Sequence, residues 1–124
     1  MEEKRADNKV IETKQKINKI DDNLDSEKKK IKNLSDMQDS VNSINRNMDR
    51  CIELLSKSIK GPTTQNIFDD MHNTNRKFLI NASQNIEDET TIARKNINEL
   101  YKEKDRIIKE SRNNSRKEEN NNKE

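Results

Sequence analysis

Two side chains in this sequence could do chemistry of their own, and each is the only residue of its type. His72 is the single histidine and Cys51 the single cysteine. A metal site needs several ligands at characteristic spacing, and none accompanies His72, so we expect a histidine on a helix surface. Cys51 lies among apolar neighbours on a predicted helical face, which favours a small buried hydrophobic residue; a reactive thiol or an intermolecular disulfide is the alternative. A lone cysteine excludes an intrachain disulfide.

The remaining residues form no recognisable catalytic pattern. A glycine-rich phosphate-binding loop is ruled out because the sequence contains one glycine. No nucleophile, base and orienting residue stand at any familiar spacing, and the composition provides too small a core for a preorganised pocket. We therefore expect no enzymatic activity, no cofactor and no metal.

Composition indicates long, thin helices instead of a globular core. Only 27% of the 124 residues are hydrophobic, whereas 26 basic and 24 acidic residues leave a net charge of +2. Acidic residues directly precede the basic run Lys28-Lys29-Lys30, so we interpret this run as a solvated face and expect no binding to nucleic acid. Helices of this composition bury one stripe and leave their other faces in water.

The only glycine and the only proline, Gly61 and Pro62, lie next to each other in the middle of the chain. Glycine in the left-handed conformation ends many helices, and proline is tolerated where a helix begins. We expect Thr63 or Thr64 to cap the second helix. The predicted fold is all-α: two long antiparallel helices forming a coiled-coil-like hairpin over residues 1–110, with its turn near 59–64.

Apolar residues recur with heptad spacing on both sides of this turn. In the first half the seam is thin, because Thr13 and Glu27 occupy two of its positions. Nearer the turn, the apolar stripe widens and Gln38 and Asn45 take two a positions. The first seam consists of Val10, Ile17, Ile20, Leu24, Ile31 and Leu34, and the second of Ile86, Ala93, Leu100 and Ile107.

Folding about the turn pairs residues whose numbers sum to roughly 124, which sets Leu24 near Leu100 and Val41 near Ala82. The same pairing leaves about the first dozen residues without an intramolecular partner. Residues 111–124 contain no apolar side chain and are predicted to be a disordered polar tail. A thin seam and unpaired ends indicate that another helical chain completes the core.

No stretch of the sequence is apolar enough for a transmembrane helix, and Met1-Glu2-Glu3-Lys4-Arg5 leads into no apolar segment of a signal peptide. We expect no membrane insertion. The predicted location is the cytoplasm, or outside the cell by a route that reads no cleavable signal.

Two short motifs fit a known family. Ile59-Lys60-Gly61 lies where a W-x-G turn would join two helices, with Ile59 in place of the tryptophan, and Tyr101 and Asp105 give Y-x-x-x-D near the end of the second helix. Over about residues 20–110 the chain resembles the W-x-G helical-hairpin proteins of type VII secretion, particularly the YwqH-like partners of LXG toxins.

This resemblance implies a small adaptor that binds the helical N-terminal region of an LXG-type toxin, together with a second small helical protein, and helps present the toxin for export. Tyr101 and Asp105 would then form part of the export signal, and Ile59, Gly61 and Pro62 the turn motif. The alternative is a structural coiled-coil subunit of a cytoplasmic assembly. The expected partner-binding face comprises Leu24, Ile31, Leu34, Val41, Ile44, Met48, Ala93, Ile97 and Leu100.

Overall fold

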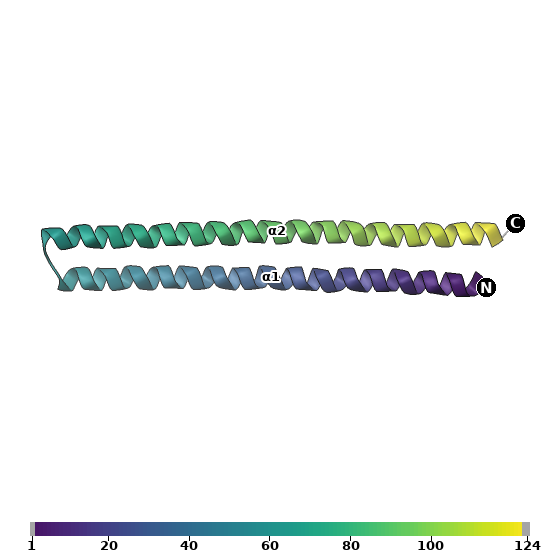
Figure 1. Ribbon diagram of the computed structural model, residues 1–124, viewed down its shortest axis with the longest axis horizontal. Helices are drawn as coiled ribbons and strands as arrows, with labels where there is room; N and C mark the ends of the chain where they lie inside the picture. The colour runs from purple at the N-terminus through teal and green to yellow at the C-terminus, as the bar shows by residue number, and fades with distance from the viewer. Residues whose placement is uncertain (1, 123–124) are drawn as a thin grey trace. The chain divides into compact units, whose positions relative to one another are not determined.

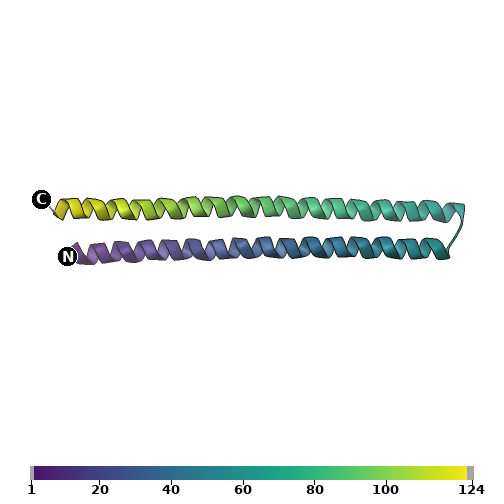
Figure 2. The ribbon, with the colours of Figure 1, turned by 180° about the vertical axis from the view of Figure 1, so that it is seen from behind.

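The computed structural model describes the backbone of residues 2–122 and the side chains of residues 5, 7–117 and 119. This part of the chain forms two helices, α1 (Glu2–Ser58) and α2 (Pro62–Asn122), and contains no strand. Both helices are continuous and are joined by one short connection (Figure 1 and, from behind, Figure 2). The predicted all-α helical hairpin is confirmed.

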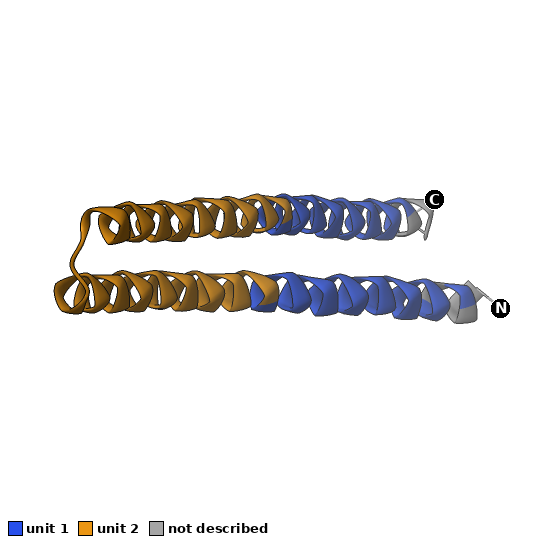
Figure 3. Cartoon of the chain, turned by 60° about the vertical axis from the view of Figure 1, so that its left-hand side comes forward, with its two compact units in different colours: residues 1–29, 93–124 blue, residues 30–92 orange. Residues whose placement is uncertain are grey.

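The hairpin divides into two compact units, each built from one segment of α1 and one of α2 (Figure 3). Unit 1 combines residues 1–29 with 93–124, and unit 2 comprises residues 30–92, including the turn. In both units the residues in contact show that the two segments run antiparallel.

The core of unit 1 is apolar. Ile20, Leu24 and Ile107 are buried against one another. The half-buried side chains packed around them are Ile17, Ile97 and Leu100. All of these residues except Ile97 come from the two predicted heptad seams, and the expected proximity of Leu24 and Leu100 is confirmed.

One ion pair joins the helices at the edge of this core. Lys104 Nζ donates to Asp21 Oδ1 across a distance of 2.7 Å. Both side chains remain partly exposed, so the pair adds little stability, of the order of 1 kcal/mol or less. The apolar contacts therefore hold unit 1 together.

Helix α2 continues through Asn122 and so extends into the residues of the expected polar tail. Residues 123 and 124 of the predicted tail lie outside the described residues. No glycine or proline follows Pro62 to interrupt the helix. The Arg106 Nη1 atom also pairs with Glu110 Oε1 at 2.9 Å, one turn further on, which supports helical geometry where the tail begins.

The extended α2 also changes the expectation for the start of α1. Val10 and Thr13 of α1 line a cavity of about 560 Å³ together with Ser111 and Asn114 of α2. These residues of α1 therefore lie beside α2 across this cavity. Val10 itself is about half exposed, so the part of the expected seam that packs against the core begins at Ile17.

The turn between the helices differs from prediction in its backbone conformation. Gly61 does not adopt a positive φ. Its carbonyl accepts the Gln65 N–H at 3.1 Å and the Thr64 hydroxyl at 2.7 Å, so Gly61 is itself the N-cap of α2. Pro62 is the first helical residue, and the threonines that we expected to cap the helix lie inside its first turn. The chain reverses here through proline and a capping glycine, without a left-handed residue.

This geometry predicts that Gly61→Ser is stabilising. A Cβ at residue 61 would lie 3.4 Å from Thr64 Oγ1, an ordinary contact. The serine oxygen could accept one of the unpaired N–H groups of the first turn, for a gain of a few tenths of a kcal/mol over glycine. Thermal unfolding followed by circular dichroism should show an unchanged or slightly higher midpoint.

Gly61→Asn is the matched control, since asparagine caps helices and also tolerates the left-handed conformation. If Gly61→Asn kept the midpoint while Gly61→Ser cost about 1 kcal/mol or more, the glycine would have to be left-handed, against the structure.

Candidate functional site

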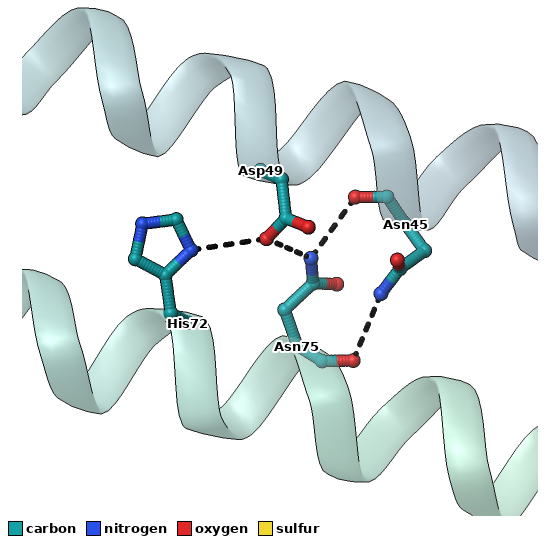
Figure 4. A network of polar contacts seen from close by, with 4 residues as sticks. All are labelled: Asn45, Asp49, His72 and Asn75. Atoms are coloured by element: carbon teal, nitrogen blue, oxygen red, sulfur yellow. Dashed lines mark hydrogen bonds and ion pairs between the residues drawn. The ribbon is translucent and has the colours of Figure 1, made fainter.

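Four polar side chains meet between α1 and α2 in unit 2 (Figure 4). Asn45 and Asp49 come from α1, and His72 and Asn75 from α2. Asn75 Nδ2 donates to the Asn45 carbonyl and to Asp49 Oδ1, both at 3.0 Å. Asn45 Nδ2 donates in return to the Asn75 carbonyl at 3.2 Å. We call these four residues the polar cluster.

Helix periodicity explains why these residues face one another. Asn45 and Asp49 are one turn apart on α1, as His72 and Asn75 are on α2, so each pair projects toward the other helix. His72 Nδ1 lies 3.0 Å from Asp49 Oδ1 and donates to it when Nδ1 carries the proton. Asn75 is 6% exposed, and both hydrogens of its amide group are used. The cluster thus satisfies the donors of its most buried member.

The polar character of this interface continues away from the turn. Gln38, seven residues before Asn45, donates through Nε2 to Ser83 Oγ at 3.0 Å. It also donates to Asn42 Oδ1 on its own helix at 3.0 Å. Gln38 and Asn45 thus occupy the inward-facing positions expected from the heptads, so polar groups lie between the helices of unit 2 in addition to its buried apolar residues Ile52, Phe68 and Ile86.

The charge of the polar cluster is concentrated on Asp49. The hydrogen bond from the Asn75 side chain, followed by that with His72, lowers the pKa of Asp49 below its ordinary value of 3.8. The bonded form of this carboxyl is therefore the ionised one.

Apolar side chains of unit 2 gather beside the polar cluster, on one flank of the two helices. They line a groove of about 590 Å³. Its lining residues are Ile44, Met48, Ile52, Ile67, Asp70, Met71, Thr74, Asn75 and Phe78. Five of these, namely Ile44, Met48, Ile67, Met71 and Phe78, are 42–50% exposed. Apolar residues that could have filled the helix interface thus lie in contact with solvent.

The expected partner-binding face divides between the two units. Leu24 and Ala93 are buried in unit 1, and Ile97 and Leu100 pack against its core. The two helices of unit 1 therefore already cover each other at this end of the face. The expected face also includes Ile31, Leu34 and Val41 of unit 2, which are half-buried. Its remaining residues, Ile44 and Met48, are 49–50% exposed and both line the groove.

The proposed export-signal residues lie on the surface of unit 1. Tyr101 is 43% exposed and Asp105 is exposed. The Lys28 ammonium group lies 5.5 Å from the centre of the Tyr101 ring. A hydrogen bond with the Tyr101 hydroxyl raises the pKa of Lys28 above its ordinary value of 10.5. Lys28 thus lies against one side of the tyrosine ring, while the tyrosine side chain is still accessible to solvent.

The structure places Cys51 and His72 differently from the prediction, and it leaves Ile59 of the turn motif exposed. Cys51 is exposed, because the inward-facing position next to it belongs to Ile52, which is 4% exposed. His72 is half-buried in the polar cluster and does not lie free on a helix surface. Ile59, in the place of the motif tryptophan, is exposed beyond the end of α1.

Within the part of the chain that the structure describes, no helix combines the length and apolarity that a membrane span requires. The same residues include no group of three or more histidine, cysteine or acidic side chains placed to hold a metal ion. In comparisons with known proteins, no family model, no curated protein and no solved structure matches this chain.

The polar cluster predicts that Asn75→Ala is strongly destabilising. The substitution removes two cross-helix hydrogen bonds and leaves the Asp49 carboxylate with one fewer donor. A loss of about 1–3 kcal/mol in the free energy of unfolding is expected for two hydrogen bonds that each contribute about 0.5–1.5 kcal/mol. Denaturant unfolding should reveal it, with Asn73→Ala at an exposed position of the same helix as the control. Equal effects of the two substitutions would argue against the cluster.

The lowered pKa of Asp49 predicts a defined pH dependence. A carboxyl group whose pKa falls on folding stabilises the folded state above its unfolded value of 3.8, and this contribution is lost as the pH drops through the folded value. In Asp49→Asn the amide oxygen can still accept from Asn75, but the charge is gone. Its thermal midpoint should therefore fall less than that of the unsubstituted protein below pH 4.

Asp39→Asn, at an exposed position of α1, controls for the general loss of one negative charge. The assignment would be wrong if Asp49→Asn and the unsubstituted protein lost stability in parallel over this acidic range.

Proposed function

We propose that this protein is a non-catalytic helical adaptor that binds the helical N-terminal region of a type VII secreted toxin and helps present it for export. Binding would occur by helix packing, with no chemical step. A second small helical protein would complete the assembly, as the resemblance to the W-x-G hairpins implies.

One observation carries the proposal that this protein binds a helical partner. Unit 2 places amides and a carboxylate between its own helices, while five large apolar side chains line a groove open to solvent. Five such side chains, each about half exposed, present apolar surface on the order of 400 Å². Patches of that size on a soluble chain commonly mark protein interaction sites.

The position of Tyr101 and Asp105 supports the secretion part of the proposal. They are one turn apart on α2, and both are exposed. Residues separated by four positions lie on the same helix face, so a receptor helix or groove could contact both. This surface belongs to unit 1, whereas the groove belongs to unit 2, so partner and export machinery would use different residues.

A structural coiled-coil subunit remains the second candidate function. The reciprocal bonds of Asn45 and Asn75 favour it, because a buried amide pair is a device by which coiled coils fix their register. A spacer of this kind does not require Tyr101 or Asp105. Substitution of these two residues therefore distinguishes the two candidate functions.

Affinity purification of the tagged protein from its native cell should recover a large protein with a long helical N-terminal region and a toxin-like C-terminal domain. Tyr101→Ala and Asp105→Ala should still recover this protein, since neither residue lines the groove, but should abolish its appearance outside the cell. Quantitative mass spectrometry of cells and medium measures both effects.

Lys28→Ala is the matched control, because it removes the contact that Tyr101 makes with α1 and leaves the motif in place. Export should persist in this variant. Normal export of both motif variants would refute the signal assignment, and recovery of only this chain or of scaffold proteins would favour the structural subunit.

A further inference from the structure

We propose that the groove of unit 2 receives one amphipathic helix from a different protein, and that this helix carries a lysine or arginine opposite Asp70. The inference rests on the proposed function, which requires a helical partner, and it assigns the binding surface and the chemistry of the partner.

The spacing of the lining residues fits a helix. On α2, Ile67, Met71 and Phe78 follow one another at intervals of four and seven, and Thr74 fills the intermediate position. On α1, Ile44, Met48 and Ile52 are four residues apart. Two helices that present such rows side by side form the groove into which the ridge of a third helix packs.

The length of the groove sets the length of the contact. From Ile67 to Phe78 the lining extends about 16 Å along α2, at a rise of 1.5 Å per residue. This distance corresponds to about three turns of the incoming helix. We therefore expect the partner to supply apolar residues at positions i, i+3 or i+4, i+7 and i+11.

The charge of Asp70 indicates whether the groove binds a second copy of this chain or a different protein. It is the single charged residue among those lining the groove, and no lysine or arginine lines it. In a symmetric dimer the same surface would face itself, so two Asp70 carboxylates would lose water with no cation from the lining to pair with them. Burying an unpaired charge is costly, which disfavours this arrangement.

A helix with a basic residue at the matching place removes this cost. Among the described residues, Asp70 makes no ion pair within the chain, so its carboxylate is available to an incoming cation. An apolar helix with one basic side chain next to its apolar stripe is thus complementary to the groove in both shape and charge.

Site-specific photocrosslinking of the full chain in its native cell tests the proposal. The probe is p-benzoylphenylalanine in place of Phe78, a substitution that keeps the aromatic ring in the groove. Ile80 carries the same probe in the control, since it is also apolar and is 59% exposed but does not line the groove. Fragmentation of the crosslinked peptides identifies the partner segment.

The expected result is a crosslink from residue 78, and none from residue 80, to a helical segment with heptad-spaced apolar residues and a lysine or arginine within one turn of the crosslinked position. Crosslinking to a second copy of this chain would overturn the proposal. Crosslinking to a segment without the heptad pattern or without the basic residue would overturn it as well.

Affinity purification with three variants separates the groove from the proposed function. Phe78→Glu should reduce recovery of the partner at least about tenfold, as expected for loss of a central apolar contact, and Ile80→Glu should not. Asp70→Lys should also reduce recovery, and reversing the charge of the partner's basic residue should restore it.

If all three variants retained the partner, the groove would be the wrong surface while the adaptor function would stand. If even the unsubstituted protein recovered no helical partner, both the groove and the proposed function would fail.

Discussion

An amide group enclosed between two helices must find its hydrogen-bond partners inside the protein, and in unit 2 this requirement fixes which residues face each other. Asn45 and Asn75 each donate to the backbone carbonyl of the other, and Asp49 accepts the second hydrogen of Asn75. A shift of either helix by one residue would rotate these side chains away from their partners. Apolar contacts tolerate such shifts better, because they have no direction. The polar cluster therefore sets the register of the two helices near the turn.

This choice of register has a consequence for the apolar residues of the same unit. Where Asn45, Asp49 and Asn75 take the space between the helices, large apolar side chains such as Met48 and Phe78 lie on the flank. Unit 1 shows the opposite arrangement, with apolar residues inside and an ion pair at the edge. Unit 2 also buries Ile52, Phe68 and Ile86, but it presents five further large apolar side chains to solvent along the groove. A protein that functions by binding a helix needs such a surface, and we place the binding site in unit 2 for this reason.

Heptad spacing in the sequence was enough to predict the two helices and the core of unit 1, because burial of one apolar stripe decides both, and the adjacent Gly61 and Pro62 predicted the antiparallel pairing. Heptad spacing does not predict the backbone conformation of the turn. There Gly61 caps α2 through its carbonyl group and has no positive φ. Composition alone also did not indicate that α2 extends to Asn122, since it does not register the absence of glycine and proline after Pro62. The sequence did contain an indication of the polar cluster, because Gln38 and Asn45 occupy heptad a positions that are usually apolar. Its partners could be found only by aligning both helices to within one residue.

Methionine oxidation by hydrogen peroxide, read by mass spectrometry, tests most directly whether the exposed flank of unit 2 is a binding surface. Met48 and Met71 line the groove, whereas Met37 is equally exposed and does not line it. In the purified protein all three should oxidise at similar rates. In the complex purified from the native cell, Met48 and Met71 should become protected while Met37 stays reactive. Protection of Met48 and Met71 already in the purified monomer, or equal reactivity of all three in the complex, would contradict this account.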